Sequence, residues 1–140
     1  MAPARQPLTS AAQRRCSWLV TESCSGGPTG EQNDLFKQRD FVGDNEITIY
    51  FVRSTVPPNN GCATHPSGKP GAVVAQVASQ WTLGHEVGHV LGLGHVDSAG
   101  ACMLNRLMTG CGTGLINVNP PQLVSSEIST MDSSSYTSNI

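Results

Sequence analysis

The fold is decided by the stretch HEVGHVLGLGH, residues 85–95, which contains three of the four histidines of the chain. His85 and His89 are four residues apart, so on a helix they lie one turn apart on the same face, with about 5–6 Å between their Cβ atoms. At that separation two imidazoles can reach one metal ion at about 2.0–2.1 Å each. Glu86 is rotated by about 100° from His85, which is too far for easy coordination but near enough to reach a metal-bound water.

Gly92 stands where this helix has to end. Because glycine adopts a positive φ without steric cost, we expect a sharp turn there that brings His95 back as a third ligand. Three neutral nitrogens with an open fourth position are typical of a catalytic zinc site. The pattern therefore predicts one zinc ion held by His85, His89 and His95, with Glu86 as the catalytic residue.

The sequence before this motif alternates in the manner of β-strands. Residues 46–52 (EITIYFV) place Ile47, Ile49 and Phe51 on one side and predict a strand. Residues 72–77 (AVVAQV) predict a second, buried strand, after a Pro- and Gly-rich loop over residues 56–71. Residues 8–23 fit a helix, and a strand over residues 17–21 fits nearly as well.

At the motif the spacing of apolar residues changes from the alternation of a strand to that of a helix. A helix is expected over residues 80–91, with Ser79 or Thr82 as its cap. An irregular segment follows, and then a terminal helix that starts at Asn119 before two prolines and has an apolar face of Val124, Ile128 and Met131. Strands followed by helices predict an α+β fold, with a small, mixed, twisted sheet and an irregular C-terminal subdomain.

The composition limits the class of protein. A chain of 140 residues suits one domain, 1–140, which we divide into subdomains at about 1–95 and 96–140. Eight basic and ten acidic residues give a net charge of −2 with no basic stripe, which argues against nucleic-acid binding. No apolar run reaches the roughly 20 residues of a membrane span, and we expect a monomer.

Five cysteines cannot all pair within one chain. A Cys102–Cys111 bond would pin the segment between them, and Cys16–Cys24 is a second candidate that leaves Cys62 alone. Cys62–Cys102 and Cys62–Cys111 are allowed as well, since spacing does not choose between them.

The cysteines and the scarcity of lysine favour a secreted protein. Arg14 and Arg15 interrupt the one apolar stretch near the N-terminus, so no secretory signal is readable there.

The motif resembles that of the metzincin zinc peptidases, whose consensus H-E-x-x-H-x-x-G-x-x-H it matches at every fixed position. Met108, in NRLMTG at residues 105–110, fits the methionine of that family's Met-turn beneath the zinc. The resemblance is specific over residues 82–110. It implies an endopeptidase in which Glu86 activates a zinc-bound water. A peptide or protein substrate would lie extended along a strand edge within residues 62–76, and residues 110–119 would wall the primed-side pocket.

Three departures leave the subfamily unassigned. Val96 separates the third histidine from Asp97, whereas adamalysin-like members carry Asp directly after that histidine. Gly110 stands where astacins and serralysins have a tyrosine, so no tyrosine is expected to assist the reaction. Snapalysins have Asp at the position of His95. Asp97 could orient a histidine or cap a turn, and we favour the turn.

Two further interpretations stay open. The chain could be a protein-interaction module that keeps zinc without cleaving, or a latent form blocked by its own N-terminal segment. The presence of Glu86 favours the enzyme. His65, in the Pro- and Gly-rich loop, is expected to be a solvated loop residue.

Overall fold

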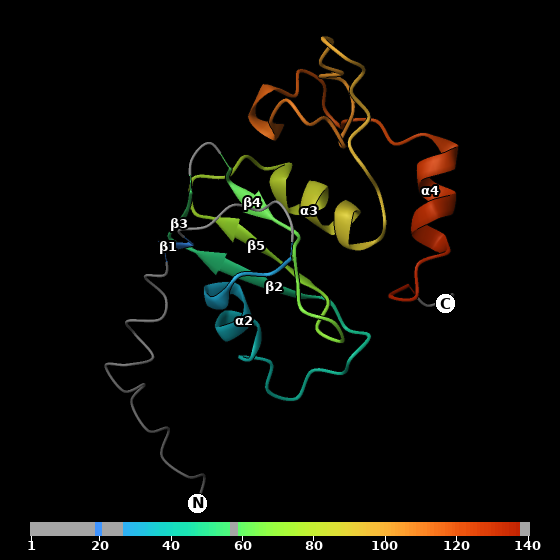
Figure 1. Ribbon diagram of the computed structural model, residues 1–140. Coiled ribbons are helices and arrows are strands. Elements are labelled where there is room, and N and C mark those ends of the chain that lie inside the picture. The colour runs from blue at the N-terminus through green and yellow to red at the C-terminus, as the bar shows by residue number, and fades with distance from the viewer. Residues whose placement is uncertain (1–18, 21–26, 57–58, 138–140) are drawn as a thin grey trace, which may run out of the picture.

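A computed structural model describes residues 19–20, 27–56 and 59–137 of the chain (Figure 1). In this part the protein is a small mixed α+β structure. Its central sheet has three strands, β2 (Thr48–Val52), β5 (Gly71–Ala75) and β4 (Gly61–Cys62), in the order β2-β5-β4. β5 runs parallel to β2 and antiparallel to β4, so the prediction of a mixed sheet is confirmed.

Both predicted strands are present, with shifted ends. β2 begins two residues later than expected, and β5 covers residues 71–75 instead of 72–77. All five residues of β5 are buried, because this strand has a neighbour on each side. In β2, Val52 is buried whereas Phe51 is 70% exposed, so the side that carries Phe51 is not the core side.

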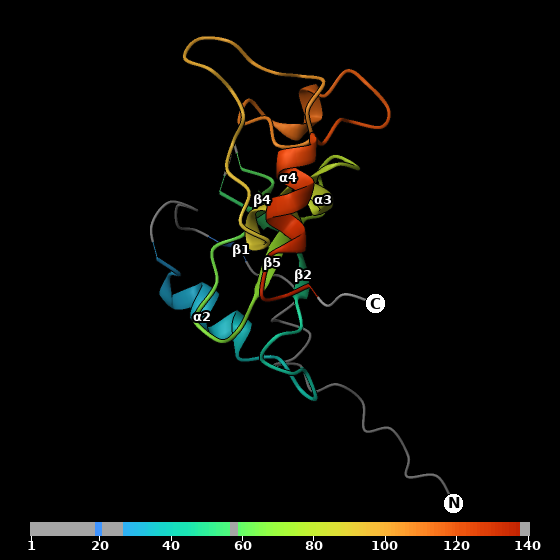
Figure 2. The ribbon, with the colours of Figure 1, turned by 90° about the vertical axis from the view of Figure 1, so that its right-hand side faces the viewer.

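Two helices cover opposite faces of the sheet (Figures 1 and 2). On one face Phe36 of α2 (Gly30–Phe36) packs with Val52, Cys62 and Val73. On the other face Gly61, which pairs with Val74, lies against Glu86 of α3 (Thr82–Val90). The histidine helix therefore lies directly on the short edge strand β4.

Helix α2 was not predicted. It begins with a capping box, in which the Thr29 hydroxyl accepts the Gln32 N–H at 3.3 Å and the Gln32 side chain accepts the Thr29 N–H at 2.9 Å. Of the N-terminal segment 8–23 the structure describes only Leu19–Val20, which form β1 and pair in parallel with β3 (Ser54–Thr55). The other residues of that segment lie outside the described part of the chain.

Helix α3 lies within the predicted range of 80–91, but its expected cap is wrong. The N-cap position is Trp81, and no side chain caps the helix. The Ser79 hydroxyl instead accepts the Trp81 N–H at 3.3 Å, in the turn that leads into the helix.

The C-terminal helix, α4 (Ser125–Asp132), starts six residues later than predicted. The chain at Gln122 pairs with the irregular segment instead: Gln122 N–H donates to Asn105 O at 2.9 Å, and Leu107 N–H donates to Gln122 O at 3.1 Å. Between η1 (Thr113–Leu115) and α4 the chain is therefore not helical: it bends over residues 118–120 and forms a bridge at Gln122.

The expected apolar face of α4 does not enter the core. Val124 is 40% exposed and Ile128 is 47% exposed, whereas Glu127 is the buried residue of this helix. The Glu127 carboxylate accepts the Val124 N–H at 2.7 Å and lies 2.6 Å from the Arg106 guanidinium. A buried ion pair thus fastens α4 to the segment that precedes Met108.

The predicted Cys102–Cys111 disulfide is present. Cys62 is disulfide-bonded as well, so the interpretation that leaves Cys62 as the lone thiol is wrong, and its alternative pairings with Cys102 or Cys111 are excluded. Cys16 and Cys24 lie outside the described residues. Among the described residues no helix is long and apolar enough to cross a membrane.

Candidate metal centre

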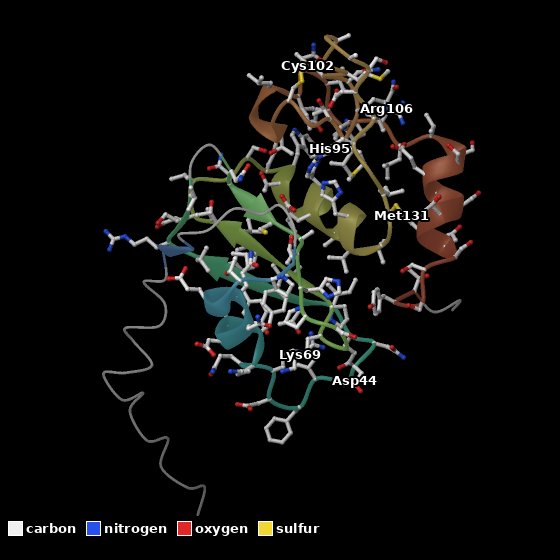
Figure 3. All side chains as sticks on the ribbon, in the orientation of Figure 1. Asp44, Lys69, His95, Cys102, Arg106 and Met131 are labelled. Atoms are coloured by element: carbon white, nitrogen blue, oxygen red, sulfur yellow. A yellow bond between two sulfur atoms is a disulfide. The ribbon has the colours of Figure 1, made fainter. Side chains whose placement is uncertain are left out.

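Three histidine side chains converge at one point above α3. His85 and His89 project from successive turns of the helix, which ends at Gly92, with φ of +102°. His95 returns to the same place and is labelled next to α3 in Figure 3. The Nε2 atom of His89 lies 3.1 Å from the Nε2 atoms of both His85 and His95. Tetrahedral zinc with bonds of about 2.0–2.1 Å separates its nitrogens by about 3.3 Å, so the three side chains fit such an ion.

Backbone carbonyls fix the tautomers of the two helical histidines. His85 Nδ1 lies 2.8 Å from Leu107 O, and His89 Nδ1 lies 2.7 Å from Leu93 O. A carbonyl only accepts, so each Nδ1 carries the proton and each Nε2 keeps its lone pair for a metal. Burial lowers the pKa of both histidines, which favours the neutral form that binds metal.

His95 is held by close packing on Gly110. A Cβ atom at position 110 would lie 2.8 Å from His95 Nδ1 and 3.0 Å from Asp97 Oδ2. The absence of a side chain at position 110 is therefore a packing requirement of the third histidine.

Asp97 ties the segment after His95 to the segment around Met108. Its carboxylate accepts the Met103 N–H at 2.7 Å, the Thr109 hydroxyl at 3.0 Å and the Gly110 N–H. These hydrogen bonds, led by that of Met103, hold the pKa of Asp97 below its usual value. These three partners lie 6 to 13 residues along the chain, so Asp97 bridges two segments and does not cap a local turn, and none of the three is a histidine.

Met108 lies beneath the helix that carries the first two histidines. Its side chain is fully buried, and a Cβ atom at Gly88 would lie 2.6 Å from its sulfur. Met108 O also accepts the Val96 N–H at 3.1 Å. Residues 107–110 thus contact the surroundings of all three histidines: Leu107 holds His85, Met108 supports the helix at Gly88, and Gly110 packs against His95.

Glu86 lies between α3 and β4 and lines the same cleft as the three histidines. It is 7% exposed, and its side chain fills the space next to Gly61 so closely that a Cβ there would overlap it. Burial raises the pKa of Glu86 to about 7, and a dication held by the histidines would lower it again. With a dication bound, Glu86 would therefore be ionised at neutral pH, which is the form that accepts a proton.

The histidines and Glu86 open into a cleft of about 460 Å³. One wall is β4 with the residues around it, 59–64. The other walls are Thr82 at the start of α3 and Thr109, Gly110, Gly112, Thr113 and Gly114. Of the predicted substrate edge over residues 62–76, β5 is internal to the sheet, so only the β4 end borders the cleft. His65 is outside this cleft and packs edge-on against Tyr136.

Two features of the site could not be read from the motif. The Leu93 and Leu107 carbonyls act through the backbone and have no residue signature. Thr82 and Thr113 meet only because the chain folds back over 31 residues, although the position of Thr82, three before His85, places it on the ligand face of the helix. Comparison with known protein families, curated proteins and solved structures gives no match.

Proposed function

We propose that this chain is a zinc-dependent endopeptidase of the metzincin type. The observation that carries the proposal is the convergence of three Nε2 atoms at a cleft that also holds a buried carboxylate. Two of these atoms, in His85 and His89, keep their lone pairs because Nδ1 carries the proton. His85, His89 and His95 would hold the ion. Bound zinc would polarise the scissile carbonyl and bring the pKa of the attacking water toward about 7.

The residues of the chain supply the remaining functions. Glu86 accepts the proton of the attacking water and passes it to the leaving amine. The Leu107 and Leu93 carbonyls orient the first two histidines, and Met108 supports the helix beneath them. The strand β4 borders the cleft in which an extended peptide would lie.

The disulfides are compatible with the secreted protein that we propose, because such bonds persist in oxidising compartments. We also propose that it acts as a monomer on peptide or protein substrates.

The test is a Glu86→Gln variant of the full chain, compared with Glu46→Gln, which makes the same chemical change on the exposed loop before β2. Both variants should bind one zinc per chain, because Glu86 is not a ligand. Cleavage of casein or of a quenched fluorescent peptide should fall by about 10²–10⁴-fold in Glu86→Gln alone. Chelation should abolish it in all forms.

His85→Ala, His89→Ala and His95→Ala should each lose stoichiometric zinc. Near-wild-type cleavage by zinc-loaded Glu86→Gln would refute the role of Glu86. A zinc-loaded wild type that cleaves nothing, even after removal of the residues before Gly26, would instead support the interaction module. Activity that appears only after this removal would identify the N-terminal segment as an inhibitor.

A further inference from the structure

The wall of the cleft at the start of α3 consists of hydroxyl groups. Thr82, the first residue of α3, is 2% exposed, and its Oγ1 lies 2.7 Å from Thr113 Oγ1 and 3.2 Å from Ser79 Oγ. Because Thr82 precedes His85 by three residues, the pair of threonines lies on the ligand face, one helical turn before the first histidine. We call Thr82 and Thr113, with Gly112 and Gly114 beside them, the hydroxyl pocket.

The hydrogen bonds of this pocket are not saturated. Ser79, Thr82 and Thr113 share three hydroxyl protons between two O···O contacts, and each oxygen can donate once and accept twice. If Ser79 donates to Thr82 and Thr82 donates to Thr113, the Thr113 hydroxyl has a proton to donate to a ligand. If Thr113 donates to Thr82 and Thr82 donates to Ser79, the Thr113 hydroxyl offers lone pairs to a ligand instead. The end of the chain at the cleft can therefore serve a hydroxyl or an amide.

The remainder of the cleft offers little to other kinds of side chain. Apart from Glu86 and the histidines, the side chains that line it in the described part of the protein are small or neutral: Asn59, Asn60, Cys62, Ala63, Thr64 and Thr109. They include no cation or further carboxylate to pair with a charged residue. They also include no aromatic or branched aliphatic group against which a large apolar residue could pack.

We propose that the hydroxyl pocket makes the protein selective for certain peptides. The peptide residue that lies next to His85 in the cleft should have a small polar side chain: serine, threonine or asparagine. This inference rests on the proposed function and adds its substrate class. An apolar side chain of the same size would remove water from the Thr113 hydroxyl without replacing its hydrogen bond, and such an unpaired group weakens binding. Sites that bind a substrate hydroxyl reject the analogue without it for this reason.

The test measures binding and does not require cleavage. Zinc-loaded full-length protein is titrated calorimetrically with peptide hydroxamates, whose hydroxamate anchors to the metal. Two matched pairs differ only in the adjacent side chain, threonine against valine and asparagine against leucine. Wild type should bind the polar member of each pair about tenfold or more tightly. Thr113→Val and Thr82→Val should reduce this ratio to about one.

Thr130→Val is the control, because the Thr130 hydroxyl bonds to Ser126 O on α4 and lies outside the cleft. It should keep the wild-type ratio. Equal binding of both members by wild type, or an unchanged ratio in Thr113→Val, would overturn the inference, as would failure of every probe to bind. If the ratio is found but no peptide is cleaved, the pocket stands and the proposed peptidase activity fails.

Discussion

Replacing Gly110 by alanine should weaken zinc binding without unfolding the protein. The new Cβ atom would lie 2.8 Å from His95 Nδ1, about 0.6 Å short of an ordinary contact of 3.4 Å. The imidazole has to move by a comparable distance, whereas metal–ligand distances tolerate only about 0.2 Å. Changes beside a ligand typically reduce metal affinity by 10–100-fold, so we expect a loss of about 1.4–2.7 kcal/mol in binding free energy.

The fold should remain intact because Gly110 is exposed, has no positive φ and keeps the N–H that donates to Asp97. Zinc affinity is measured by competition with a chromophoric chelator, and the stability of the zinc-free protein by thermal unfolding. Gly114→Ala is the matched control, since it lines the same cleft and no heavy atom lies within 4 Å of its added Cβ. Wild-type zinc affinity in Gly110→Ala would show that this contact does not position His95.

Three more predictions concern stability. Glu127→Gln should lower the free energy of unfolding in a urea titration by about 2–3 kcal/mol, because the Arg106 side chain, 12% exposed, loses its charged partner. The control Lys37→Gln breaks an exposed ion pair and should lower it by less than about 0.5 kcal/mol. Removing the Cys102–Cys111 bond by a double serine substitution should lower the free energy of unfolding by about 2–3 kcal/mol through loop-closure entropy. Non-reducing peptide mapping of the wild-type protein should recover this bond and a second one at Cys62. Thr29→Ala should cost about 1 kcal/mol through loss of the α2 cap, and an unchanged urea midpoint would contradict the capping role.

Local periodicity was sufficient to predict the parts that depend on neighbours in sequence. The strands β2 and β5 and the helix α3 follow from alternation and from the i, i+4 spacing of His85 and His89. The side of β2 that faces the core did not follow, because both sides of the strand carry large side chains with apolar surface: Ile49 and Phe51 on one, Tyr50 and Val52 on the other. Thr29 and Gln32 have the spacing of a capping box, which could have predicted the start of α2. The glycines just before Thr29 indicated a loop instead, so the helix was not predicted.

Contacts between distant residues account for the remaining differences. Pro120 and Pro121 resemble a helix start, yet Gln122 pairs through its backbone with Asn105 and Leu107. This pairing prevents a helix at Gln122, and α4 begins at Ser125. Two-residue strands such as β4 have no periodic pattern of their own. The hydroxyl pocket likewise depends on a contact between α3 and η1 that no local spacing encodes.

The disulfide divides the C-terminal half into two parts with unequal freedom to vary. Inside the closed loop lie Leu107, Met108 and Gly110, which keep the three histidines in place. Outside it, residues 112–119 contribute Thr113 to the wall of the cleft. The bond at Cys111 closes the inner part covalently, whereas the outer segment meets it through backbone contacts such as that of Asn117 N–H with Leu104 O. Substitution of outer side chains therefore leaves the inner part unchanged. The shape of this wall of the cleft can thus vary while the positions of the three histidines are preserved.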